Sequence, residues 1–241
     1  MRERNVWGEA MSMSPRLLRP RATGFNVKAL SGLVYWLDAS QSSTVSIGTG
    51  VSEWRDAAGG SIKATQATGN NQPAYQTAAQ NGKNAIYCDG VNDGFTIGDL
   101  SASFPSAATA IFAFKPDTDA DYSIYTTSNN SAFWAYPTAR TYIGAFKTTR
   151  FNNVASPLMP TSSAAVLAIT SSASAYRVYV SNTLAHDVAA DFAAGTNHRI
   201  GFNDLGTYYK GWLYEAILSS SELPVSTITA ATNYLRSKWG I

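Results

Sequence analysis

The feature of this sequence that most constrains its fold is a series of short apolar or alternating segments, each bounded by Gly, Pro, Asn, Asp or Ser. Segments of this kind predict strands joined by turns. About ten of them occupy the region from residue 29 to about residue 222, with no helical pattern between them: 33–37, 85–88, 110–114, 122–125, 133–136, 141–146, 165–169, 176–180, 198–202 and 208–218. The pattern predicts an all-β sandwich or barrel.

Only the C-terminal segment has the periodicity of an α-helix, and the sequence predicts one over residues 224–238. Apolar residues recur there at spacings of three and four, which places them on one face suited to covering a sheet. These residues are Ile228, Ala231, Leu235 and Trp239. Pro224 suits the first turn, and Gly240 is expected to end the helix.

Composition excludes several classes of protein. A hydrophobic content of 45% rules out a disordered chain, and no apolar run reaches the ~18 residues of a membrane span. The single cysteine, Cys88, rules out an intrachain disulfide and a cysteine-rich zinc site. The two histidines, His186 and His198, are expected at the surface or in turns.

The charge is distributed unevenly along the chain. Residues 1–28 hold six basic and two acidic residues, a formal charge of +4, and the remaining residues carry −2. The basic residues are Arg2, Arg4, Arg16, Arg19, Arg21 and Lys28. We expect this segment to be an extended arm that docks on an acidic neighbour, because arginine pairs well with carboxylates. A solvated tail and a non-specific nucleic-acid contact are the alternatives, although the nearly neutral remainder lacks the clustered cations that nucleic acid requires.

Several phrases of the sequence are similar, in this order, to one known family. They include GLVYWLDAS at 32–40, VSEWRD at 51–56, CDGVND at 88–93, GWLYE at 211–215 and YLRSKWGI at 234–241. Through them, residues 29–241 resemble a laminin-G-like, concanavalin-A-like domain that is common in bacteriophage structural proteins. The resemblance implies a jelly-roll sandwich of two antiparallel sheets, with the predicted helix after it.

The function that the resemblance implies is structural. The chain would be a non-enzymatic virion protein that displays residues 29–241 on the particle surface, as capsid decoration or with the tail or fibre. Residues 1–28 would attach it to other virion proteins, and host surface glycans are a further expected partner. Synthesis in the bacterial cytoplasm agrees with the lack of an apolar secretory signal after the basic start. Membrane insertion is not expected, and a homo-oligomer is left open.

Three other functions are weighed against this one, the third being a pure cement protein that binds no ligand. The first is a dedicated carbohydrate-binding adhesin module, with or without calcium. The second is a polysaccharide-cleaving enzyme, which needs two carboxylates that face one cleft. Glucanases that resemble this fold carry the strand motif Glu-x-Asp-x-(x)-Glu, and the motif is absent here. The sequence therefore predicts no catalytic residues.

Candidate glycan contacts lie in residues 122–153, a segment rich in aromatic and amide side chains. Aromatic rings recognise the C–H face of a sugar, and amides bond its hydroxyl groups. The residues selected are Trp134, Tyr136, Asn129 and Asn130. Four other tryptophans lie in the phrases that define the fold and are expected to pack in the core: Trp36, Trp54, Trp212 and Trp239.

One group of acidic residues is a candidate metal site. Asp117, Asp119 and Asp121 alternate along a loop, and three such carboxylates can ligate calcium. A solvated turn is the alternative, and no other cofactor is expected. A second polar group is expected to form a turn only: Asp89, Asn92 and Asp93.

Overall fold

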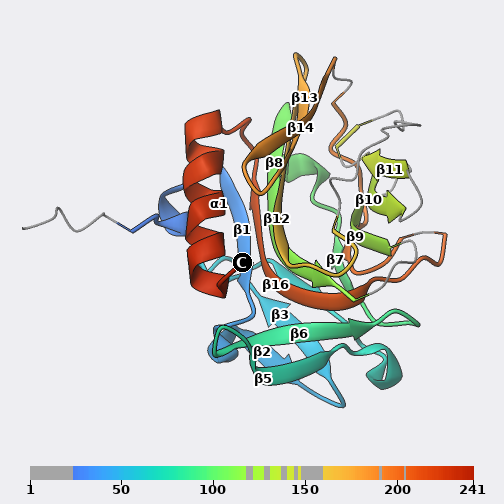
Figure 1. The fold of residues 1–241 in the computed structure, drawn as a ribbon. Helices are drawn as coiled ribbons and strands as arrows, with labels where there is room; N and C mark the ends of the chain where they lie inside the picture. Colours follow the sequence, from blue (N-terminus) through green and yellow to red (C-terminus); the bar gives the residue numbers. More distant parts are fainter. Residues whose placement is uncertain are drawn as a thin grey trace, which may run out of the picture.

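The computed structural model of the chain describes residues 24–117, 122–127, 131–136, 140–143, 146–147, 160–189, 192–203 and 205–241. For 131–136 and 140–143 it describes the backbone alone. These residues form a sandwich of two antiparallel sheets with an α-helix outside it, as the sequence predicts (Figure 1). Single turns of 3-10 helix join some strands: η1 (Val27–Ala29), η2 (Ser42–Thr44), η3 (Gly69–Asn71) and η4 (Ser101–Ser103).

The first sheet, called sheet A here, has eight strands. They are β1 (Leu33–Asp38), β5 (Ala74–Gln80), β6 (Lys83–Asp89), β8 (Ala107–Pro116), β12 (Ala165–Ser172), β13 (Tyr176–Val180), β14 (Thr183–Val188) and β16 (Lys210–Ser219). Their order across the sheet is β14-β13-β12-β8-β16-β6-β5, and β1 also pairs with β16.

The second sheet, sheet B, also has eight strands. They are β2 (Val45–Ile47), β3 (Val51–Arg55), β4 (Lys63–Thr65), β7 (Phe95–Gly98), β9 (Tyr122–Thr127), β10 (Ser131–Tyr136), β11 (Arg140–Ile143) and β15 (His198–Ile200). Their order is β11-β10-β9-β15-β7-β4-β3-β2.

Strand β16 lies at the centre of sheet A. One of its edges pairs with β8 along almost its whole length. Its other edge pairs with β6 through residues 210–213 and with β1 through residues 215–219. The first and the last strand of the described residues, β1 and β16, are therefore neighbours in the same sheet.

The core lies between the sheets and also under the helix. Phe112 and Phe114 of β8 are buried between the sheets, where the Phe112 ring lies 5.4 Å from the ring of Tyr125 in sheet B. Alternate residues of β8, Ile111 and Ala113, face the opposite side and are buried as well. All eight residues of β12 are buried for the same reason, since both faces of the strand are covered. A strand covered on both faces has a continuous apolar sequence rather than an alternating one.

His198 is buried, so the expectation that both histidines lie at the surface or in turns is wrong for this residue. Its side chain is 0% exposed, its Nδ1 shares a hydrogen bond with the Tyr125 hydroxyl, and its ring stacks on Phe104 at 5.7 Å. Burial lowers the pKa of His198 to about 4, because the charged imidazolium form would lose its hydration. His198 therefore acts as a neutral core residue.

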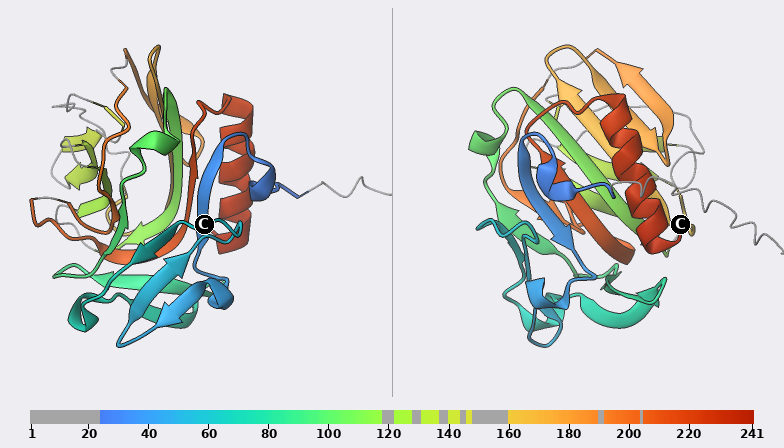
Figure 2. Two further views of the ribbon diagram at one scale, coloured as in Figure 1. Left: turned by 180° about the vertical axis from the view of Figure 1, so that it is seen from behind. Right: turned by 90° about the vertical axis from the view of Figure 1, so that its left-hand side faces the viewer.

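The helix α1 (Val225–Trp239) packs on the outer face of sheet A, across β12 and β8 (Figure 2). The predicted stripe is confirmed, because Ile228, Ala231, Leu235 and Trp239 are all buried. Pro224 precedes the first helical residue, and Gly240 ends the helix with a left-handed φ of 66°. Among the described residues, no helix is long and apolar enough to span a membrane.

Candidate functional site

The last turn of α1 is joined to sheet A by a buried ionic network. Asp38 and Glu215 are opposite each other in the β1–β16 pairing, so both side chains project from the sheet on the side of α1. Lys238 lies between them, with its Nζ 2.7 Å from Asp38 Oδ2 and 2.6 Å from Glu215 Oε2. The side chains of Asp38 and Glu215 are only 2% and 0% exposed.

Aromatic residues complete the hydrogen bonding of Glu215. The indole N–H of Trp36 donates to Oε1 at 2.6 Å, and the indole N–H of Trp239 donates to Oε2 at 3.0 Å. The Tyr234 hydroxyl donates to Oε1 at 3.4 Å. Trp239 is fully buried, as expected, whereas Trp36 is partly exposed and acts mainly as a donor to Glu215.

Glu215 has a strongly perturbed acidity, but it is closed to any substrate. Burial, and next the charge of Asp38, raises its pKa to about 7, while the Lys238 ammonium and the Trp239 indole act in the opposite direction. A raised carboxyl pKa beside a second carboxylate can indicate a glycosidase. Here both carboxylates are inaccessible and fully bonded, so the network holds the helix to the sheet.

Glu215 and His198 have opposite effects on the pH dependence of stability. The folded-state pKa of His198 is below its ordinary 6.5, so its contribution is complete above that pH and is lost as the pH falls to about 4. The folded-state pKa of Glu215 is above 4.5, so its contribution is complete below that pH and is lost as the pH rises to about 7. The two contributions oppose each other between pH 4.5 and 6.5.

Replacing His198 by phenylalanine should therefore change the slope of stability against pH. One pKa unit corresponds to about 1.4 kcal/mol. Relative to the wild type, the variant should gain about 3 kcal/mol of unfolding free energy as the pH is lowered from 7.5 to 4.5. Urea unfolding at several pH values measures the difference in unfolding free energy between the variant and the wild type. Repacking around the phenylalanine shifts this difference equally at every pH, so it does not affect the change with pH. Parallel profiles for the two proteins would contradict the assignment.

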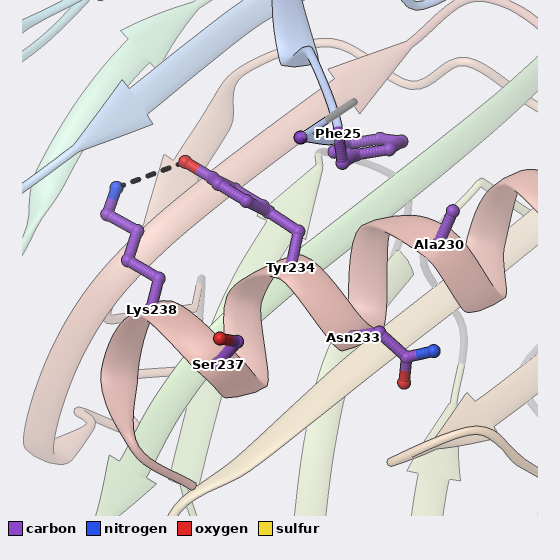
Figure 3. Close-up of a pocket in the computed structure, with 7 residues that line it drawn as sticks. Phe25, Ala230, Asn233, Tyr234, Ser237 and Lys238 are labelled. Carbon is purple, nitrogen blue, oxygen red and sulfur yellow. Dashed lines mark hydrogen bonds between the residues drawn. The ribbon is translucent and has the colours of Figure 1, made fainter. Parts of the chain in front are cut away.

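An open groove of about 620 Å³ lies beside this network, on the side of α1 that faces the N-terminal segment (Figure 3). Its lining consists of Gly24, Phe25, Ala230, Asn233, Tyr234, Ser237 and Lys238. The rings of Phe25 and Tyr234 have their centroids 5.6 Å apart and are tilted by 38°. The Tyr234 hydroxyl also accepts a hydrogen bond from Lys238 Nζ at 3.4 Å, so the ring is held in place.

The lining of the groove combines apolar rings with small polar groups. Asn233 and Ser237 are exposed on the solvent face of α1, and Tyr234 is half-buried between them and the sheet. The volume lies in the range of ordinary small-molecule sites. A sugar ring is bound by aromatic faces that contact its C–H groups and by amide and hydroxyl groups that bond its hydroxyls. The groove offers both, so it is a candidate carbohydrate site.

A second surface with aromatic residues lies on the outer face of sheet A, beyond the end of α1. The strand register places Tyr87 of β6, Trp212 of β16 and Lys115 of β8 directly beside one another. The Tyr87 and Trp212 rings are 4.9 Å apart, and both are partly exposed. We call these three residues the outer row. Trp212 was expected to be a packing residue, and it does pack against the core, but from the outer face of sheet A and only partly buried.

The predicted calcium residues are only partly described. Asp117 is exposed; its backbone N–H donates to the Lys210 carbonyl, and its Oδ2 accepts a hydrogen bond from the Tyr87 hydroxyl at 3.3 Å. Asp119 and Asp121 lie outside the described residues. Within the described part of the chain, no three His, Cys, Asp or Glu side chains are grouped closely enough to hold a metal ion.

The predicted turn formed by Asp89, Asn92 and Asp93 is confirmed. Asp89 Oδ1 accepts from the backbone N–H of Val91 at 2.7 Å and of Asn92 at 3.3 Å. Asp93 Oδ2 accepts from the backbone N–H of Asp89 at 2.9 Å. The carboxylates are therefore used to fix the backbone.

Most of the predicted glycan-contact and arm residues lie outside the residues that the structure describes. Trp134 and Tyr136 belong to β10, of which the backbone alone is described, and Asn129 and Asn130 are not among the described residues. The structure also does not describe five of the arm residues: Arg2, Arg4, Arg16, Arg19 and Arg21. Lys28 is described and lies exposed on η1.

Sequence reasoning missed the groove. The signal that it offered was the polar face of the predicted helix, on which Ala230, Asn233 and Ser237 recur at spacings of three and four. The other wall, Phe25, belongs to the segment that the sequence assigned to the arm, and nothing in the sequence places it against Tyr234.

Comparison with known proteins supports the fold. No protein-family model matches the sequence, and no curated protein sequence matches it. Among solved structures, domain 4 of AbnA, a GH43 extracellular arabinanase from Geobacillus stearothermophilus in complex with arabinotriose, is similar with a TM-score of 0.60 and 16% identity. That similarity covers 83% of this chain and 97% of the arabinanase domain.

Two larger proteins contain a similar domain. A sialidase from Trypanosoma rangeli in complex with sialic acid matches with a TM-score of 0.59 and 13% identity, over 86% of this chain and 33% of the sialidase. The binding domain of Paraclostridial Mosquitocidal Protein 1 matches with a TM-score of 0.61 and 11% identity, over 86% of this chain and 53% of that one. The chain thus spans about a third of the sialidase. It is a two-sheet β-sandwich similar in structure to domains of a sialidase, an arabinanase and a toxin.

Proposed function

We propose that this chain is a carbohydrate-binding module and that the groove between α1 and Phe25 is its sugar site. The observation that carries the proposal is the composition of the groove. Phe25 and Tyr234 offer ring surface for the C–H face of a sugar, and Asn233 and Ser237 offer hydrogen bonds to its hydroxyl groups. The similar arabinanase domain, whose structure holds arabinotriose, supports the choice of a carbohydrate as ligand.

We propose binding without catalysis. Among the described residues, Asp38 and Glu215 are two carboxyl groups that lie close together, and both are buried against Lys238. Glycoside hydrolysis requires both carboxyl groups to reach the glycosidic bond. Calcium dependence through Asp117, Asp119 and Asp121 is tested by repeating each binding experiment with a chelator.

The test is a titration of the full-length protein with arabinotriose, followed by NMR, together with a multivalent glycan array that detects weak ligands. Replacing Phe25 by alanine should weaken binding at least tenfold, because one wall of the groove is lost. Leu184→Ala, which removes an exposed side chain of β14, is the matched control and should bind as the wild type does.

The outer row provides the rival location. Loss of binding in Trp212→Ala together with unchanged binding in Phe25→Ala would place the sugar on the outer row. Absence of binding to arabinotriose and to every glycan of the array would contradict the proposed function. Melting temperatures of the three variants show whether a loss of binding reflects unfolding.

We further propose that the module is displayed on a bacteriophage particle, a reading that rests on the sequence phrases within residues 29–241. The basic N-terminal segment would attach it to an acidic virion protein. Deleting residues 1–23 spares Val27, which is 3% exposed and packs in the core. The truncated protein should fold and bind sugar but fail to join particles; incorporation at normal copy number would exclude the anchor.

A further inference from the structure

We infer that the groove selects uncharged sugars and rejects sugar acids such as sialic and uronic acids. This inference rests on the proposed function and names the class of ligand. Among the residues that line the groove, only Lys238 carries a charge. The selectivity therefore depends on whether the Lys238 ammonium is available to a carboxylate of the ligand.

The donors of Lys238 are already engaged. An ammonium group has three N–H donors. Lys238 Nζ donates hydrogen bonds to Glu215 Oε2 at 2.6 Å and to the Tyr234 hydroxyl at 3.4 Å, and it forms an ion pair with Asp38 Oδ2 at 2.7 Å. The Lys238 side chain is only 12% exposed. A sugar carboxylate that enters the groove therefore meets an ammonium group that is nearly buried and already paired with two carboxylates.

The net charge behind the groove also disfavours an anion. Asp38 and Glu215 together carry up to two negative charges against the single positive charge of Lys238. At neutral pH the cluster is therefore negative or neutral. Like charges within a few ångströms repel in a partly buried site, since little water screens them.

An uncharged sugar meets no such opposition. Its C–H face can rest on the rings of Phe25 and Tyr234, whose centroids are 5.6 Å apart. Its hydroxyl groups can bond to Asn233 and Ser237, which are both exposed on α1. None of these contacts depends on a free charge, so binding should vary little with salt concentration.

The experiment compares neutral and acidic probes on the full-length protein by NMR titration. The neutral probes are arabinotriose and lactose, and the acidic probes are 3′-sialyllactose and trigalacturonic acid. At least one neutral probe should bind, with an affinity at least tenfold above that of both acidic probes. Equal or tighter binding of an acidic probe would overturn the inference and leave the proposed function intact. No binding of any probe or array glycan overturns both.

A charge variant tests the cause of the selectivity. Ser237→Lys places an unpaired ammonium on the lining of the groove and should improve binding of 3′-sialyllactose or trigalacturonic acid at least fivefold, with a new dependence on salt. Ser226→Lys adds the same charge to an exposed position of α1 outside the lining and is the matched control. Equal improvement in both variants would show only a long-range charge effect and would overturn the explanation.

Discussion

Replacing Glu215 by alanine is expected to lower the free energy of unfolding by about 3–5 kcal/mol, because it leaves buried hydrogen-bond donors without their acceptor and opens a cavity under α1. The variant would leave the Lys238 ammonium with one carboxylate and remove the acceptor of two indole N–H groups. Helix α1 should then detach more readily from sheet A. Urea unfolding at pH 7 measures the loss of stability, and hydrogen exchange of the α1 amides locates it.

The control for this variant is Glu222→Ala. Glu222 pairs with Arg177 at 2.8 Å, but both side chains are about 30% exposed. Exposed pairs of this kind contribute about 0–1 kcal/mol. If the two substitutions lower the free energy of unfolding by similar amounts, the buried Glu215 network contributes no more than a surface pair, and the prediction is wrong.

Gly211→Ala should have an effect of comparable size for a steric reason. Gly211 lies in β16 with a φ of 143°, and a Cβ there would overlap the backbone carbonyl oxygen of Lys115 and lie 2.8 Å from Pro116 Cα. Both neighbours are backbone atoms of the paired strand β8, so they cannot move aside as a flexible side chain could. We expect a loss of at least about 3 kcal/mol from overpacking combined with backbone strain.

A second glycine separates strain from overlap. Gly98 has a φ of 104°, and nothing lies within 4 Å of the position its Cβ would take. Gly98→Ala should therefore lose only the part that arises from backbone strain, about 1–2 kcal/mol. Urea unfolding measures the loss of unfolding free energy in each variant. Equal losses in Gly211→Ala and Gly98→Ala would show that the overlap with β8 contributes nothing.

The parts of the fold that depend on local pattern could be predicted from the sequence. The spacing of Ile228, Ala231 and Leu235 alone indicated a one-sided helix, and these residues are buried. Alternation in Tyr176 and Val178 likewise indicated the buried face of a strand. Such predictions succeed because period and burial are linked within a single element.

Features that depend on pairing between distant elements could not be predicted. Lys238 has the position of an ordinary basic residue in a last helical turn. Only the β1–β16 register brings Asp38 and Glu215 together beneath it. Trp212 lies in a phrase typical of the fold, yet the face of β16 on which it lies became clear only from its pairing with Lys115. His198 has polar neighbours in sequence, and its burial comes from Phe104 and Tyr125.

The central position of β16 also determines when this protein can fold. Three strands, β1, β6 and β8, find a partner in β16, and all three precede it in the chain. Until the ribosome has added Ser219, each of them has an edge of unpaired N–H and C=O groups. Pairings between segments so far apart form slowly, because a long loop must close before any contact compensates for the lost entropy. Sheet A can therefore be completed only after its last strand has been translated, and until then the edges that β16 will cover must be kept from pairing with other chains.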